Sequence, residues 1–136
     1  MTPTRESSQE EGAGPPVPRT LCDVRAVTAP DAVADASAGA LWRLAEPGRQ
    51  LDANVVHLPA RQRVDPHTEP ELDVLLLVVG GDGTLGTSEG DQRLAEGALL
   101  WLPHGAARAL TAGPGGLSYL TVHRRRPGLR IGPPPS

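Results

Sequence analysis

The side chains in this sequence that could do chemistry are few, and they exclude several reaction classes. All 13 basic residues are arginine, so no lysine is available as a Schiff-base nucleophile or a general base. Cys22 is the single cysteine, which excludes an internal disulfide framework and a cysteine-rich zinc site. No spacing typical of a Ser-His-Asp or Cys-His arrangement is present. Three kinds of chemistry are left: acid–base work by paired carboxylates, anion binding by arginine and metal binding by histidine with carboxylates.

The charge balance and the lack of long apolar stretches narrow the expected partners. The net charge is −3, whereas a nucleic-acid-binding domain usually carries a basic face. The basic run Arg124–Arg126 lies beside Pro127 and Gly128 and is predicted to be a solvated tail. No apolar stretch reaches the roughly 18 residues of a membrane span, and the polar residues 1–14 lack the apolar region of a secretory signal. We therefore expect a cytoplasmic protein that binds neither nucleic acid nor membranes.

The central part of the chain has the pattern of short β-strands. Apolar runs alternate with turn signals rich in glycine and proline, and no helical period lies between them. The predicted strands are Leu41–Leu44, Leu51–Leu58, Leu72–Val79, Thr84–Thr87, Gln92–Leu94, Ala98–Leu102, Ala107–Thr111 and Leu117–His123. Such a pattern indicates an all-β sandwich or barrel. The glycine-rich segment Gly80–Gly83 between two of these runs is interpreted as a hairpin turn.

The segments on either side of the strands differ from them in composition. Residues 1–20 are rich in Glu, Ser, Gly and Pro and cannot bury enough apolar surface to offset the entropy lost on ordering. A short helix is predicted around Pro30–Ala38, because Pro and Asp open it and Gly follows it. The predicted organisation is a flexible segment at 1–39, one β-barrel at 40–124 and a flexible tail at 125–136.

The strand Leu72–Val79 is apolar at both parities. Successive residues of a strand point to opposite faces, so this pattern predicts a strand that is covered on both faces. One face should look into the barrel. The other should meet a second sheet, a flanking segment or another subunit, and a homodimer would supply the last of these.

One stretch of the strand region resembles a motif of the cupin superfamily. Gly97–Gly105 fits the opening of the second cupin motif, Gly-x5-Pro-x-Gly-x2-His-x3-Asn. Arg108 stands where that motif has its histidine, and Ala112 stands where it has its asparagine. The resemblance implies a double-stranded β-helix, or jelly-roll, barrel over about 85 residues.

The first cupin motif, Gly-x5-His-x-His-x3–4-Glu-x6-Gly, is similar to this chain in spacing more than in letters. Asp73 followed by Gly80 fits Glu-x6-Gly with Asp for Glu. Glu69 then falls at the second histidine position and His67 at the first, while Arg61 replaces the opening glycine. His67 is thus the single motif histidine that is kept.

The resemblance implies where a ligand or metal would bind. In metal-binding cupins three His and one Glu converge on iron, manganese, nickel or zinc, and the matching residues here are His67, Glu69, Asp73 and Arg108. Arginine is always charged and is no ligand. One interpretation is therefore an internal salt bridge of Arg108 with Glu69 and Asp73. A second is that Arg108 binds the carboxylate or phosphate of a small ligand, with His67 as a further polar contact.

The remaining candidates have ordinary structural explanations beside the functional ones. Trp101 is a candidate ligand-binding wall of the barrel, although core packing is the favoured explanation for it and for Tyr119. His104 occupies a turn and is predicted to be exposed. His57 and His123 lie in predicted strands as hydrogen-bonded wall residues.

The preferred hypothesis is a small-molecule-binding or regulatory cupin without a bound transition metal or other cofactor. Its rival is a metal-dependent enzyme of the dioxygenase or isomerase type that uses His67, Glu69 and Asp73. A third alternative is a module that works through its surface as a dimer. The sequence leaves open whether any reaction is catalysed.

Overall fold

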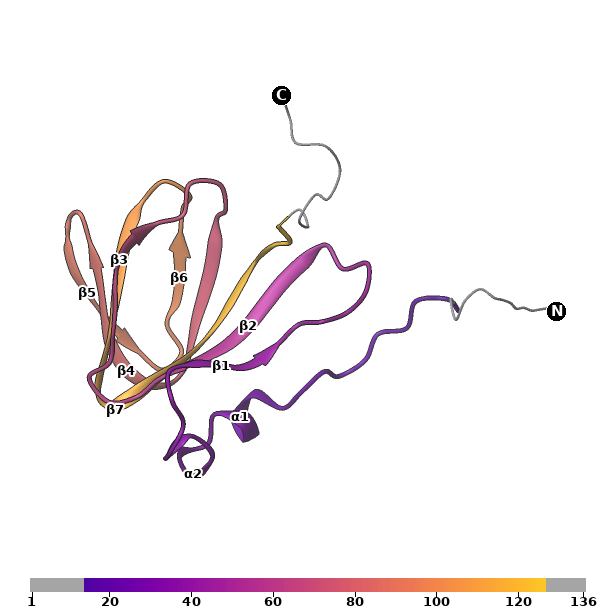
Figure 1. The fold of residues 1–136 in the computed structure, drawn as a ribbon, viewed down its shortest axis with the longest axis horizontal. Helices are drawn as coiled ribbons and strands as arrows, with labels where there is room; N and C mark the ends of the chain where they lie inside the picture. The colour runs from indigo at the N-terminus through magenta and orange to yellow at the C-terminus, as the bar shows by residue number, and fades with distance from the viewer. Residues whose placement is uncertain (1–13, 127–136) are drawn as a thin grey trace.

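The computed structural model describes residues 14–126, and seven strands make up more than half of these residues (Figure 1). The two short helices are α1 (Val24–Val27) and α2 (Pro30–Val33). The strands are β1 (Gly39–Arg43), β2 (Leu51–Leu58), β3 (Arg63–Thr68), β4 (Val74–Thr87), β5 (Gly90–Ala95), β6 (Leu99–Leu102) and β7 (Ala107–Arg124). The sequence predictions for residues 1–13 and 127–136 lie outside the described residues.

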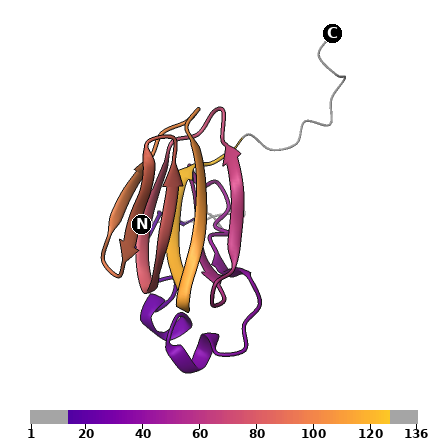
Figure 2. The same ribbon diagram turned by 90° about the vertical axis from the view of Figure 1, so that its left-hand side faces the viewer.

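The two long strands β4 and β7 pair with each other and link two groups of shorter strands. The first part of β4 pairs with β6, and its last part pairs with β5. In the same way β7 pairs with β3 near its beginning and with β2 near its end, and β2 pairs with β1. All of these pairs are antiparallel. The strands therefore wind as a double-stranded β-helix, the jelly-roll barrel that the motif spacing predicted (Figures 1 and 2).

The predicted hairpin turn at Gly80–Gly83 is wrong. The chain runs through this segment as part of β4, and the register against β7 shifts on both sides of Gly81, which has φ +70°. A Cβ on Gly81 would meet the carbonyl of Gly116 on β7. The glycines thus allow a bulged, bent strand that lies close to its neighbour. Glycine serves a turn and a bulge equally well, so composition alone could not separate them.

The two strands predicted at Ala107–Thr111 and Leu117–His123 are likewise one continuous strand, β7, which includes the glycines between them. The sequence also missed β3, whose residues Arg63–Thr68 include Pro66 and few apolar side chains. This strand is held by its pairing with the beginning of β7. Its place in the sheet therefore depends on a partner that is distant in the sequence, at Ala107–Thr111.

The barrel interior is filled by aliphatic side chains. The buried core residues are Leu58, Val74, Leu76, Val78, Leu85, Leu94, Leu102, Leu110, Ala112, Leu117 and Tyr119. Tyr119 is 6% exposed, so its predicted place in the core is confirmed. Trp101 is 59% exposed, and the favoured core packing of this residue is wrong. It pairs with Leu75, which lies on the outer face of β4, and residues that pair directly share a face.

The outer face of β4 is covered only in part. Leu76 and Val78 are buried in the barrel, whereas Leu75 on the outer face is 43% exposed. Leu77 and Val79, further along the same face, are half-buried. They lie beside the flanking segment that contains α1. The predicted covering of this strand is thus confirmed on the inner face, whereas the outer face is covered only in part.

The flanking segment reaches the sheet through two single-turn helices at the end of the barrel opposite the β6–β7 loop (Figures 1 and 2). Asp23 caps α1, and its carboxylate accepts a hydrogen bond from the Arg25 backbone N–H at 3.0 Å. The helix predicted around Pro30–Ala38 is present but shorter, because α2 ends at Val33. Among residues 14–126, no helix has the length and apolar character needed to cross a membrane.

Candidate ligand-binding site

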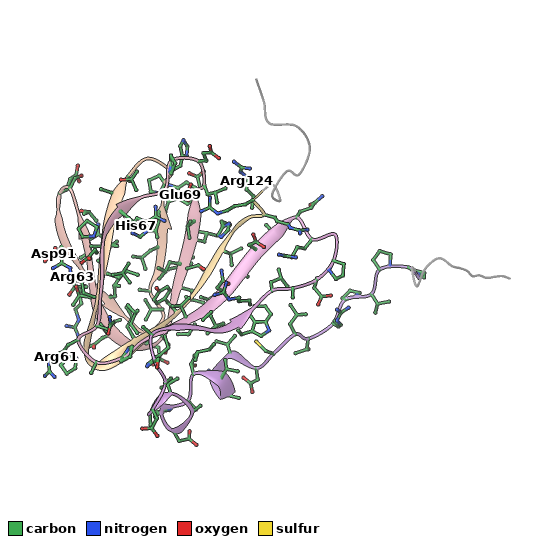
Figure 3. All side chains as sticks on the ribbon, in the orientation of Figure 1. Arg61, Arg63, His67, Glu69, Asp91 and Arg124 are labelled. Atoms are coloured by element: carbon green, nitrogen blue, oxygen red, sulfur yellow. The ribbon has the colours of Figure 1, made fainter. Side chains whose placement is uncertain are left out.

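The four motif positions lie at one end of the barrel but do not converge on one point. His67 on β3 and Arg108 on β7 are direct partners across the two strands. Glu69 follows β3, and Asp73 comes just before β4. Figure 3 shows His67 and Glu69 near the end of the barrel at which β7 ends with Arg124. The hydrogen bonds of each side chain show that they take separate partners.

Asp73 binds the turn between β6 and β7. Its Oδ1 atom accepts a hydrogen bond from the backbone N–H of His104 at 2.9 Å and lies 2.7 Å from the Nδ1 atom of the same residue. The backbone N–H of His104, and then its imidazole, lower the pKa of Asp73. The His104 side chain is exposed, as predicted, although the sequence showed no sign of its carboxylate partner.

Glu69 is committed to the end of β7. Its Oε1 atom pairs with the guanidinium of Arg126, and its Oε2 atom accepts a hydrogen bond from the Glu71 N–H at 2.9 Å. These bonds, led by that of Arg126, lower the pKa of Glu69 to about 2. The prediction that Arg124–Arg126 is only a solvated tail is therefore wrong at Arg126. The Glu69 carbonyl also accepts a hydrogen bond from the Gly105 N–H at 2.8 Å, which ties both motif segments together.

Arg108 points into the barrel. It lies two and four residues before the buried residues Leu110 and Ala112 on β7, so it shares their inward face. Its Nη1 atom is buried and has no hydrogen-bond partner among the described residues. The predicted salt bridge with Glu69 and Asp73 is wrong, because Arg126 and His104 hold those carboxylates.

A cavity of about 490 Å³ lies beside Arg108, between the β4–β5 hairpin and β6. Its walls include buried Leu85 and Leu102. Trp101 also lines it, although the Trp101 side chain lies on the outer face of β6 with that of Leu75. Thr87, Gln92 and Glu89 supply polar atoms from the hairpin. His67, Glu69 and Asp73 do not line it. The candidate site is therefore built around Arg108, and the hairpin residues are the part that the motifs did not indicate.

The metal that the resemblance implies does not fit these residues. Within residues 14–126, no three His, Cys, Asp or Glu side chains are grouped so that they could hold an ion. Asp73 and Glu69 already bind His104 and Arg126, and the Arg108 guanidinium would repel a divalent cation. His67 is exposed, with its Nδ1 atom 3.3 Å from the Asp65 carbonyl. The arrangement suits an anion better than a cation.

Two other histidines were predicted as wall residues. His57 is 4% exposed and its Nδ1 atom lies 2.8 Å from the Ser118 hydroxyl oxygen. Burial lowers the pKa of His57. His123 is half-buried, and its Nδ1 atom lies 2.7 Å from the Arg124 carbonyl. Both agree with hydrogen-bonded wall residues, and neither lies at the Arg108 cavity.

Comparison with known proteins identifies the fold. No family model matches the sequence, and no curated protein matches it. A conserved protein of unknown function from Streptococcus pyogenes matches with a TM-score of 0.62 and 18% identity, over 85% of this chain and 95% of its own. A Klebsiella pneumoniae protein with a double-stranded β-helix domain matches with a TM-score of 0.61 and 15% identity, over 76% of this chain and 83% of its own.

A sugar phosphate isomerase of the cupin superfamily from Silicibacter pomeroyi matches with a TM-score of 0.54 and 20% identity. The match covers 58% of this chain and 53% of that protein, so the chain spans about half the length of this relative. At such identities the likeness shows the fold.

Proposed function

Since the chain has the cupin fold, we propose that it is a small-molecule-binding protein whose barrel cavity takes an anionic ligand through Arg108, without a transition metal at the motif positions. The observation that carries the proposal is the buried Nη1 atom of Arg108, which has no partner among the described residues. An unsatisfied buried donor costs about 1–3 kcal/mol. A ligand oxygen at this point would remove that cost.

The charges around the cavity favour a ligand with a single negative charge. Arg108 is the one cation among the lining residues, and Glu89 lies on the hairpin side. One guanidinium compensates one carboxylate through paired, charge-assisted hydrogen bonds. A second negative charge on the ligand would meet Glu89 instead of another cation. The proposed ligand is therefore a monocarboxylate and not a phosphate.

The walls of the cavity favour an apolar body on that ligand. Leu85, Leu100 and Leu102 are buried or half-buried lining residues with aliphatic side chains. Contacts with aliphatic and aromatic walls supply most of the affinity of a small-molecule site, while a few polar groups fix its orientation. The volume of about 490 Å³ is within the usual range of such sites.

Binding of phenylacetate, a monocarboxylate with an aromatic body, tests the proposal by calorimetric titration. Charge-assisted hydrogen bonds contribute about 1.5–3 kcal/mol, so Arg108→Gln should raise the dissociation constant at least about tenfold. Arg93→Gln is the matched control, because Arg93 is 78% exposed at its side chain and does not line the cavity. Equal binding by wild type and Arg108→Gln, or no binding by wild type, would contradict the proposal.

The metal part of the proposal has its own test. Elemental analysis of protein purified without added metal should find less than one equivalent of iron, manganese, nickel and zinc. One equivalent that disappears in His67→Ala would favour the metal-dependent enzyme instead. It would also require the Glu69 and Asp73 carboxylates to leave the partners described above.

A further inference from the structure

A second cavity, of about 630 Å³, lies outside the barrel between the α1–α2 segment and the sheet. It is at the end of the barrel opposite the β6–β7 loop, so it is remote from the Arg108 cavity (Figures 1 and 2). Its lining includes Thr28 and Pro30 from the helical segment, His57 from β2, Ser118 from β7 and Gly80 from β4. No residue lines both cavities.

The cavity exists because one row of residues across the sheet has glycine at both of its ends. Gly80 on β4, Ser118 on β7, His57 on β2 and Gly39 on β1 are successive partners across four strands. Neither end of this row carries a side chain. The next row on the same face holds Leu77, Leu120 and Val55, and it is filled. The cavity is therefore open above the His57–Ser118 pair.

The pair at the base of this cavity is polar and buried. His57 is 4% exposed and Ser118 is 3% exposed, and the His57 Nδ1 atom lies 2.8 Å from the Ser118 Oγ atom. This bond uses one ring nitrogen, and the Nε2 atom has no hydrogen-bond partner among the described residues. Burial lowers the pKa of His57, so the imidazole is neutral near pH 7. A neutral ring leaves Nε2 either as a donor or as an acceptor, according to its tautomer.

The charged groups at the rim balance one another. Arg25 on α1 and Glu96 in the turn after β5 are the two charged residues that line the cavity, and both are exposed. The site thus offers one cation, one anion and an uncharged base. A hydroxyl group suits each of these partners, because it donates to a carboxylate or a ring nitrogen and accepts from a guanidinium or a ring N–H.

We propose that this cavity is a second binding site, for a small uncharged molecule that carries several hydroxyl groups. One hydroxyl meets the His57–Ser118 pair at the base, and others meet Arg25 and Glu96 at the rim. The proposal does not depend on the Arg108 site. Its binding should therefore survive Arg108→Gln.

Titration with glucitol, an uncharged polyol, tests this assignment by NMR of the imidazole nitrogens in the full chain. Glucitol should shift the His57 Nε2 resonance, and His57→Phe should weaken binding about tenfold, the loss expected for one buried hydrogen bond. His123→Phe is the matched control, because His123 is also hydrogen-bonded on a strand but does not line the cavity. Unchanged binding in His57→Phe would overturn the proposal, as would a titration that moves no His57 resonance.

A second variant fills the hollow without touching the polar pair. A Cβ on Gly80 would lie 3.7 Å from the Ser118 Cβ atom, which is ordinary contact, so Gly80→Val should fold. Its side chain should displace the polyol and weaken glucitol binding by at least as much as His57→Phe. Gluconate has the same carbon skeleton as glucitol but carries a carboxylate, so it tests whether the cavity prefers an uncharged or an anionic ligand. Tighter binding of gluconate than of glucitol, or full glucitol binding by Gly80→Val, would contradict an uncharged ligand in this cavity.

Discussion

Asp73 binds His104 through two atoms, accepting from the backbone N–H at 2.9 Å and meeting the Nδ1 atom at 2.7 Å. This carboxylate replaces the glutamate that the resemblance assigns to metal binding. Here it binds the turn that leads into β7, and Arg108 lies four residues after His104. A position to which the resemblance assigns metal binding therefore helps to place the Arg108 guanidinium in this protein.

The acid stability of the protein should depend on the bond between Glu69 and Arg126. The pKa of Glu69 is lowered from its ordinary value of 4.5 to about 2, chiefly by Arg126. A lowered pKa in the folded state contributes stability that is complete above pH 4.5 and is lost as the pH falls toward 2. Denaturation by urea at a series of pH values should show this loss in wild type.

Arg126→Gln should make the stability change across that pH window smaller, because the leading cause of the shift is removed. Arg93→Gln is the control, since its guanidinium does not contact Glu69 and pairs only loosely with Asp82, at 3.5 Å. An identical pH dependence for wild type and Arg126→Gln would show that this ion pair does not form in solution.

Replacement of Arg108 by an apolar residue should separate stability from binding. Arg108→Met keeps much of the side-chain volume and removes the buried nitrogen that has no described partner. The free energy of unfolding should rise by about 1 kcal/mol, while phenylacetate binding is lost. Proteins often sacrifice stability at binding sites in this way. A variant that is less stable by a similar amount would indicate that Arg108 is satisfied in the free protein.

The overall barrel was predictable from the sequence because its signals are local. Both motif spacings and the apolar runs at Leu51–Leu58 and Leu117–His123 depend on neighbouring residues, and the strands at these runs formed as expected. The joining of β4 through Gly80–Gly83 was not predictable, because it depends on the contact of Gly81 with Gly116 in a distant strand.

Of the predicted site residues, Arg108 lines the cavity and points into the barrel, whereas the Trp101 side chain lies on the outer face. The motif placed Arg108 correctly inside the barrel. It could not indicate that Asp73 and Glu69 turn to His104 and Arg126, because charged side chains choose among partners that only the folded chain brings close.

The bend of β4 should depend on glycine at position 81. Gly81 has φ +70°, and a Cβ there would clash with the Gly116 carbonyl. Gly81→Ala should therefore destabilise the protein by more than about 1 kcal/mol. Gly115→Ala is a matched control in the facing segment, because its Cβ would have no neighbour within 4 Å and its φ is not positive. Urea denaturation compares the two, and equal stabilities would contradict the close approach of β4 to β7.

Neighbouring leucines on β4 should differ in their contribution to stability. Leu76 is 1% exposed in the core, and Leu75, the preceding residue, is 43% exposed on the outer face. Leu76→Ala should cost about 2–5 kcal/mol because it leaves a cavity, whereas Leu75→Ala should cost less than about 1 kcal/mol. Urea denaturation at low protein concentration measures both, and a repeat at high concentration tests the outer face. A cost at Leu75 that equals the cost at Leu76 only at high concentration would show that a second copy covers Leu75. Equal costs at every concentration would contradict the inward and outward directions assigned to this strand.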